Sequence, residues 1–162
     1  MIDVVKALHN EGTTYPFEQS IPLENDILPY ADGQFCEACV VTGTYRAEGK
    51  DIVVDATVTF AITCLCDRCG TKTKKSFSLP FHVVFAKTPQ DDSYGYEKNE
   101  VPLQQAVADE IVLDLPSSVT CREDCKGLCP KCFCNRNETA CSCEAEEAGK
   151  NNPFAALREM KF

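Results

Sequence analysis

The sequence is poor in the features from which catalytic sites are usually built. Its 162 residues include only two histidines, His9 and His82, and neither stands at a spacing that metal ligands use. Catalytic zinc usually takes histidine or carboxylate ligands and keeps one position open for water. The chain also lacks a glycine-rich phosphate loop, a nucleophile elbow and a persuasive catalytic dyad. We therefore expect a protein that is not an enzyme.

Long apolar runs are also absent. No run approaches the length of a membrane span. The first twenty residues, MIDVVKALHNEGTTYPFEQS, contain neither an uninterrupted apolar region nor a small-residue cleavage site, so they do not resemble a signal peptide. These absences predict a soluble, cytoplasmic protein, and in that compartment thiols stay reduced.

Positive charge is in the minority. The chain has 16 Lys and Arg against 25 Asp and Glu, a net charge of −9. Residues 1–120 hold 9 basic and 18 acidic side chains, whereas residues 121–162 hold 7 of each. This balance disfavours a protein that binds nucleic acid simply by neutralising phosphates, because such binding depends on many Lys and Arg contacts. It leaves room for a local basic face near the C-terminus.

Alternation of apolar and polar residues predicts three strands. Residues 52–62, IVVDATVTFAI, place every second, mostly apolar, side chain on one face, and residues 77–85, FSLPFHVVF, repeat the pattern. Pro80 in the second of these lacks an N–H and suits an edge strand. Upstream, residues 38–51 predict a third strand and a turn at Gly49. The three strands should form an antiparallel meander.

One helix is predicted near residues 102–114. Pro102 suits a first turn, and Leu103, Ala106, Val107 and Ile111 recur at helical spacing. Residues 91–100 are polar and are predicted to form an exposed loop. The predicted fold class is α+β: an antiparallel β-rich body with one packing helix over residues 1–120, a C-terminal cysteine-rich zinc-binding module at 121–149, and a short C-terminal helix at 150–162.

Twelve cysteines are the most unusual feature of the composition. In a reducing compartment such a number indicates metal binding rather than disulfides. Zinc takes four soft ligands in a tetrahedron, and two cysteines on one tight turn can supply two of them. Eight thiols in four pairs fit two structural Zn²⁺ sites, although spacing does not show which pairs share an ion. The four pairs are Cys66 and Cys69, Cys121 and Cys125, Cys129 and Cys132, and Cys141 and Cys143.

Four cysteines stand outside these pairs. Cys36, Cys39 and Cys64 lie in or beside strands and are interpreted as small buried hydrophobic residues. Cys36 and Cys39 also form a CxxC pair, however, and could be a further half-site. Cys134 could be a ligand or a spare thiol.

The pair Cys66 and Cys69 stands at the end of a long strand with only two thiols. Completing a tetrahedron there requires either cysteines from the tail or Cys36 and Cys39. Our hypothesis is that the tail folds back and is joined to the sheet by a shared ion.

Two basic runs accompany the cysteines and could contact RNA, since zinc knuckles with interleaved cations are a recurring RNA-binding device. Each run could equally be a solvated surface. A zinc ion held by four thiolates also carries a formal charge of −2, so these cations could instead screen their own metal site. The first run contains Arg68, Lys72, Lys74 and Lys75, and the second contains Arg122, Lys126, Lys131 and Arg136.

The segments CDRCG, IVLDLP, CREDCKGLCPKC, CSC and NPFAALREMKF together resemble the YceD family of large ribosomal RNA subunit accumulation proteins. The resemblance covers about residues 15–162 and implies that the eight paired cysteines match the cysteines of the zinc-type members. It also implies that Gly127, Leu128 and Pro130 belong to the family's loop. Where family members usually have glycine after the tail CxxC, this chain has Phe133 and then the additional Cys134.

Together, the residues and the resemblance predict a non-enzymatic zinc-binding factor that supports accumulation of large-subunit (23S) ribosomal RNA and ribosome assembly. The expected partners are large-subunit rRNA or a pre-ribosomal particle, and a basic ribosomal protein facing the acidic body. No membrane or small-molecule substrate is expected. One alternative is an adaptor that binds a ribosomal protein or nuclease without touching RNA. Another is a redox or metal-buffering protein, which the extra thiols suggest but which would not need so much scaffold.

Overall fold

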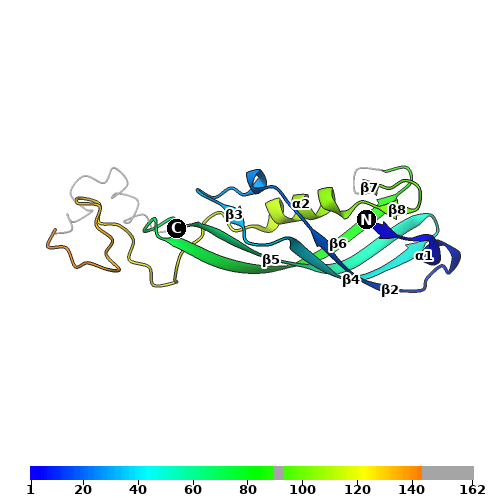
Figure 1. Cartoon of the computed structure of the whole chain (residues 1–162), viewed down its shortest axis with the longest axis horizontal. Coiled ribbons are helices and arrows are strands. Elements are labelled where there is room, and N and C mark those ends of the chain that lie inside the picture. The colour runs from blue at the N-terminus through cyan, green and yellow to red at the C-terminus, as the bar shows by residue number, and fades with distance from the viewer. Residues whose placement is uncertain (90–92, 144–162) are drawn as a thin grey trace, which may run out of the picture.

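Two long strands form the centre of the fold (Figure 1). In the computed structural model, which describes residues 1–89 and 93–143, β5 (Asp51–Leu65) and β6 (Lys72–Ala86) pair antiparallel over their whole length. Alternate side chains of β5, such as Val54, Val58 and Ile62, are buried, because successive side chains of a strand point to opposite faces. Both strands were predicted from this alternation, and both are confirmed.

The main sheet extends outward from this pair on both sides. β4 (Cys39–Glu48) pairs antiparallel with β5 across the predicted turn at Gly49, so the meander is confirmed. β7 (Tyr94–Gly95) pairs in parallel with only Phe85 and Ala86 at the end of β6. Among the described residues, Pro80 therefore lies on an edge, as its missing N–H predicts. β2 (Tyr15–Ile21) has no counterpart among the predicted strands. The strand order is β2–β4–β5–β6–β7, and β3 (Gln34–Phe35) lies beside β5.

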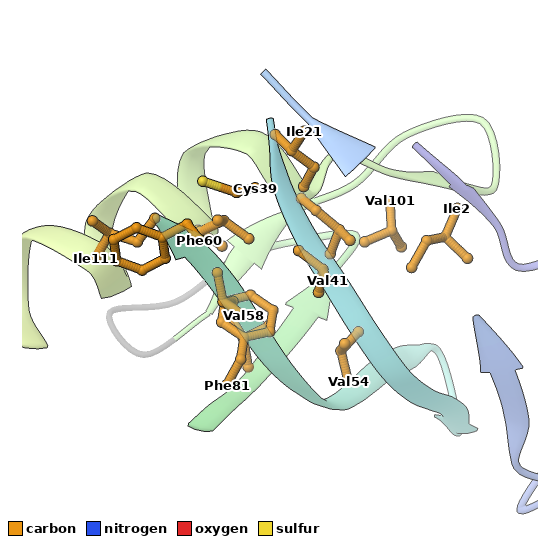
Figure 2. Close-up of a cluster of buried hydrophobic side chains, with 14 of the residues drawn as sticks. Ile2, Ile21, Cys39, Val41, Val54, Val58, Phe60, Phe81, Val101 and Ile111 are labelled. Carbon is orange, nitrogen blue, oxygen red and sulfur yellow. The ribbon is translucent and has the colours of Figure 1, made fainter. Parts of the chain in front are cut away.

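Helix α2 (Leu103–Asp114) covers the apolar face of the sheet, as predicted (Figure 2). Its buried residues are the four expected from helical spacing, and Ile111 belongs to the same core as Phe60 of β5. Cys39 and Cys64 are fully buried in this same core. Their interpretation as small buried hydrophobic residues is therefore confirmed, whereas Cys36, which was interpreted in the same way, is only half-buried.

The segment predicted as an exposed loop at 91–100 is more ordered than expected, and that prediction was wrong for the part that the structure describes. β7 lies within it, and β8 (Glu100–Val101) begins at its last residue. Tyr96 is buried, and its hydroxyl donates to the carbonyl of Lys50 at 2.7 Å. The reason is that Tyr94 and Tyr96 stand among polar residues. Burial of their large, mostly apolar rings stabilises the folded segment. β8 pairs with β1 (Ile2–Asp3), close to α1 (Val5–His9), and a 3₁₀ turn spans Asn25–Ile27.

None of the helices in the described ranges is long and apolar enough to cross a membrane. The helix predicted at 150–162, and residues 144–149 of the predicted zinc module, lie outside the described residues.

Candidate metal centres

The first cysteine pair lies in the turn that joins β5 to β6. The N–H of Cys66 donates to the carbonyl of Thr71 at 3.0 Å, and the N–H of Gly70 donates to the carbonyl of Cys66 at 2.8 Å. Gly70 has φ of +69°, a left-handed conformation that glycine adopts without steric cost. The turn buries both Cys66 and Cys69 at the tip of the long hairpin.

The chain that follows α2 returns to this hairpin tip. The N–H of Asp67 donates to the carbonyl of Val119 at 2.9 Å, and the N–H of Val119 donates back to the Asp67 carboxylate. The hydroxyl of Tyr30 donates to the carbonyl of Pro116. The cysteine-rich segment then continues beyond the hairpin tip, at the end of the molecule away from the N-terminus (Figure 1). This path brings Cys121 and Cys125 against the first pair.

Cys66, Cys69, Cys121 and Cys125 form the first tetrad, with all four sulfur atoms within 4.8 Å of one another. The Sγ atoms of Cys66 and Cys125 are 3.9 Å apart, and those of Cys69 and Cys121 are 3.7 Å apart. Two sulfurs of a tetrahedral site with metal–sulfur distances of about 2.3 Å are separated by about 3.8 Å. The tetrad therefore has the dimensions of a four-coordinate metal site, and its second half comes from the tail rather than from Cys36 and Cys39.

Cys129, Cys132, Cys141 and Cys143 form the second tetrad, also with sulfur atoms within 4.8 Å of one another. A tight turn supplies the first two thiols, because the N–H of Phe133 donates to the carbonyl of Cys129 at 2.9 Å. The structure thus brings all eight predicted cysteines into two groups of four that could hold metal ions.

The thiols of each tetrad differ in acidity. Burial acts to raise the pKa of Cys66, but backbone N–H groups, that of Cys121 first, lower it to about 6. Burial and the neighbouring thiols raise the pKa of Cys121 to about 12. In the second tetrad the N–H groups of Cys132 and Lys131 lower the pKa of Cys129 to about 6. Four thiols this close cannot all ionise unless a cation balances their charge, which is the condition a bound dication supplies.

Two asparagines that the sequence pattern did not indicate bond the tail to the first tetrad and to the hairpin. The Asn137 amide nitrogen donates to the Cys125 sulfur at 3.3 Å, while its oxygen accepts the backbone N–H of Lys126 at 2.8 Å. The Asn135 amide donates to Thr71 of the hairpin at 3.3 Å. Asparagine between closely spaced cysteines is the signal that could have found them, because its short amide readily bonds nearby backbone.

Gly127 lies where the tail passes closest to the hairpin. Its φ is +70°, and a Cβ placed on it would lie 3.0 Å from the carbonyl oxygen of Arg68. The same carbonyl accepts the N–H of Leu128 at 3.0 Å. Any side chain at position 127 would therefore be strained and would also push the tail away from the first tetrad.

Gly127→Ala should lower the free energy of unfolding by about 1–2 kcal/mol from left-handed strain, and by more if the tail is displaced. Chelator competition should then release metal faster than from the wild-type protein. Gly12→Ala is the matched control, since Gly12 has φ of +76° but no atom within 4 Å of the added Cβ. Equal losses and equal release rates in both variants would show that the contact with Arg68 does not matter.

Phe133 and Cys134 follow the second turn. Phe133 has φ of +56° and a side chain that is 72% exposed. A residue with a Cβ in this conformation costs about 1–2 kcal/mol, which glycine avoids. The Cys134 sulfur lies 3.3 Å from that of Cys132, closer than two sulfurs on one tetrahedral ion. Cys134 therefore lies next to the second tetrad, but its sulfur is too close to that of Cys132 for the two to be ligands of one tetrahedral ion.

The four basic residues predicted for the hairpin lie in three different environments. The Arg68 guanidinium donates to the carbonyl of Cys125 at 3.2 Å, so it joins the hairpin to the tail. Lys72 and Lys74 are exposed on one face of β6. Lys75 pairs across the strands with Ile62 on the other face and is half-buried.

The basic residues of the tail all lie on its surface. Arg122 bonds the Asn137 amide oxygen at 2.8 Å and lies 3.4 Å from Asp124. Lys126, Lys131 and Arg136 have exposed side chains within the loops that carry the tetrads. The exposed cations of both runs therefore flank the metal centres.

A polar cluster lies on the outer face of the sheet. His82 pairs across the strands with Asp55, and their side chains are in contact at 2.5 Å, while Arg46 donates to the other carboxylate oxygen at 2.6 Å. The contacts from His82 and then Arg46 lower the pKa of Asp55. All three side chains are substantially solvated, as in ordinary cross-strand pairs, which contribute little to stability.

Comparison with known proteins connects this architecture to one family. The profile of the large ribosomal RNA subunit accumulation protein YceD matches residues 54–161, more than half of the chain. The large ribosomal RNA subunit accumulation protein YCED homolog 1 of Arabidopsis thaliana, a chloroplastic protein, is 24% identical over 83% of this chain and 52% of its own length. An uncharacterized protein of Mycobacterium leprae is 30% identical over 51% of this chain and 42% of its own.

An uncharacterized protein of Mycobacterium bovis is 32% identical over 51% of this chain and 44% of its own length. The chain thus spans about half the length, or less, of these curated relatives. No solved structure matches it significantly. The profile match begins within β5 and includes both cysteine tetrads. The chain therefore belongs to the YceD family.

Proposed function

We propose that this protein is a cytoplasmic, non-enzymatic zinc protein that supports the accumulation of large-subunit ribosomal RNA during ribosome assembly. Membership of the YceD family supports the role in rRNA accumulation, because the family is described by that role. The plant relative carries the same description in its name.

The two tetrads support the choice of metal and its role. Four thiolates at tetrahedral spacing are a donor set that zinc prefers, and they leave no coordination position open for water. A zinc ion in such a closed site acts by holding loops together. In this chain the first ion would join the hairpin tip to the tail, and the second would shape the loops that carry Lys131 and Arg136.

The distribution of charge supports two kinds of partner for two parts of the chain. The exposed cations around the tetrads would approach rRNA in a pre-ribosomal particle. The body, with 18 acidic against 9 basic side chains in residues 1–120, would face a basic ribosomal protein. Local positive charge at one end would thus coexist with a net charge of −9.

The test is capture of the tagged full chain from native lysate, with large- and small-subunit rRNA quantified before and after nuclease treatment. We expect enrichment of large-subunit rRNA that is lost in the Cys129→Ser/Cys132→Ser variant, because the second tetrad cannot then bind its ion. Cys36→Ser is the control, since Cys36 belongs to neither tetrad. Equal recovery of both rRNAs, or no rRNA, with the wild-type protein would contradict the proposal.

An adaptor that contacts only protein is the second candidate. The acidity of the body favours it, because that surface repels phosphates and attracts basic proteins. Recovery of a ribosomal protein or nuclease that survives nuclease treatment, with no enrichment of rRNA, would select this candidate.

A further inference from the structure

Phe133 combines two features that are unfavourable in the part of the chain that the structure describes. Its backbone is left-handed at φ of +56°, and its side chain is 72% exposed. No ring contact joins it to another aromatic side chain in the described part of the chain. Among residues 1–89 and 93–143, the strained backbone of Phe133 is therefore not offset by burial of its ring, and strain of this kind is characteristic of functional positions.

The position of Phe133 is set firmly by its surroundings. Its N–H donates to the carbonyl of Cys129 at 2.9 Å, and the N–H of Cys129 donates to the carbonyl of Cys134 at 2.9 Å. The backbone carrying the ring thus belongs to the turn that supplies two thiols of the second tetrad. A ring on such a turn loses little conformational freedom when it binds a flat partner.

The charges beside Phe133 favour an anionic partner. Lys131 precedes it by two residues and Arg136 follows by three, and both side chains are exposed. An exposed aromatic ring flanked by cations is the arrangement with which proteins bind single-stranded nucleic acid, because the ring stacks on a base while the cations approach phosphates. A basic or neutral peptide would not use these cations.

We propose that Phe133 is the platform on which one unpaired base of single-stranded RNA stacks. This inference deepens the proposed function and rests on its RNA contact, for which it names the residue and the form of the RNA. A base-paired duplex would not present an unstacked base to the ring, so single strands should bind better than duplexes of the same sequence.

The probe is a short single-stranded RNA that contains one 2-aminopurine, whose fluorescence is quenched on stacking. It is titrated with the zinc-loaded full chain and with Phe133→Gly, Phe133→Leu and Phe133→Tyr. We expect Phe133→Gly and Phe133→Leu to weaken binding by about tenfold and to abolish the quenching. Phe133→Tyr should retain both, because it keeps the ring. Phe133→Gly should also melt at a temperature no lower than the wild-type protein, because glycine relieves the strained φ.

Leu113→Ala is the matched control, since Leu113 is an 80% exposed apolar side chain on α2. It should leave affinity and quenching unchanged. Equal affinity of Phe133→Gly and the wild-type protein for the RNA would overturn the stacking role while leaving the proposed function intact. Absence of binding by the wild-type protein to either single-stranded or duplex RNA would overturn both. Loss of a captured ribosomal protein from Phe133→Gly, with RNA binding unchanged, would assign the ring to a protein contact and overturn the inference.

Discussion

The wild-type protein should bind two metal ions, and the Cys66→Ser/Cys69→Ser variant should bind only one. These two thiols are half of the first tetrad, and serine hydroxyls are poor ligands for a soft site. Structural zinc in peptide sites contributes on the order of 10 kcal/mol of binding free energy, so losing one ion should remove a large part of what holds the tail to the hairpin. Metal content by elemental analysis measures the first effect.

Limited trypsin digestion measures how firmly the tail is held to the hairpin. The tail carries Arg122, Lys126, Lys131 and Arg136, all exposed as side chains but held in loops by the contacts of the tetrads. We expect cleavage after Arg122 and Lys126 to become much faster in the variant, since Arg122 lies between the two tail cysteines of the first tetrad and Lys126 directly follows the second of them. Cys36→Ser should keep two ions and the wild-type digestion pattern. Two retained ions together with an unchanged pattern in the double variant would refute the shared site.

A methyl group at position 43 should separate β4 from β5. Gly43 pairs with Ala56, and a Cβ on Gly43 would lie 2.3 Å from the carbonyl oxygen of Asp55 and 2.4 Å from the Ala56 Cα. Backbone atoms cannot move aside as a flexible side chain can. Gly43→Ala should therefore lower the free energy of unfolding by about 3 kcal/mol, the upper part of the range for overpacked positions. Denaturant unfolding followed by circular dichroism measures this loss.

Gly95→Ala is the control for this experiment. Gly95 also lies in a strand, but its added Cβ would come no closer than 3.6 Å to Pro89. Its free energy of unfolding should stay within about 0.5 kcal/mol of the wild-type value. If Gly43→Ala unfolds at the same denaturant concentration as Gly95→Ala, the close approach of the two strands is not the reason for glycine at position 43.

Several features of the fold could be predicted because they depend on local patterns. Burial of one sheet face imposes a period of two on β5, and burial of one helix face imposes the spacing of Leu103, Val107 and Ile111. The tight turns of Cys66 with Cys69 and of Cys129 with Cys132 are equally local. The two-residue strand β7 is too short to show an alternation. β2 was missed although its side chains do alternate between half-buried and exposed, and its pairing with β4 cannot be read from its own residues.

The strand meander, the helix and the four thiol pairs could all be predicted, because each arises from residues only a few positions apart. The three-dimensional fold was needed to show that Cys66 and Cys69 join Cys121 and Cys125, and that Asn137 bonds the Cys125 sulfur. It was also needed to show that Lys75 lies on the opposite face of β6 from Lys72 and Lys74. Residues more than 50 positions apart meet only when the chain after α2 returns to the hairpin tip, and neither composition nor spacing encodes that path.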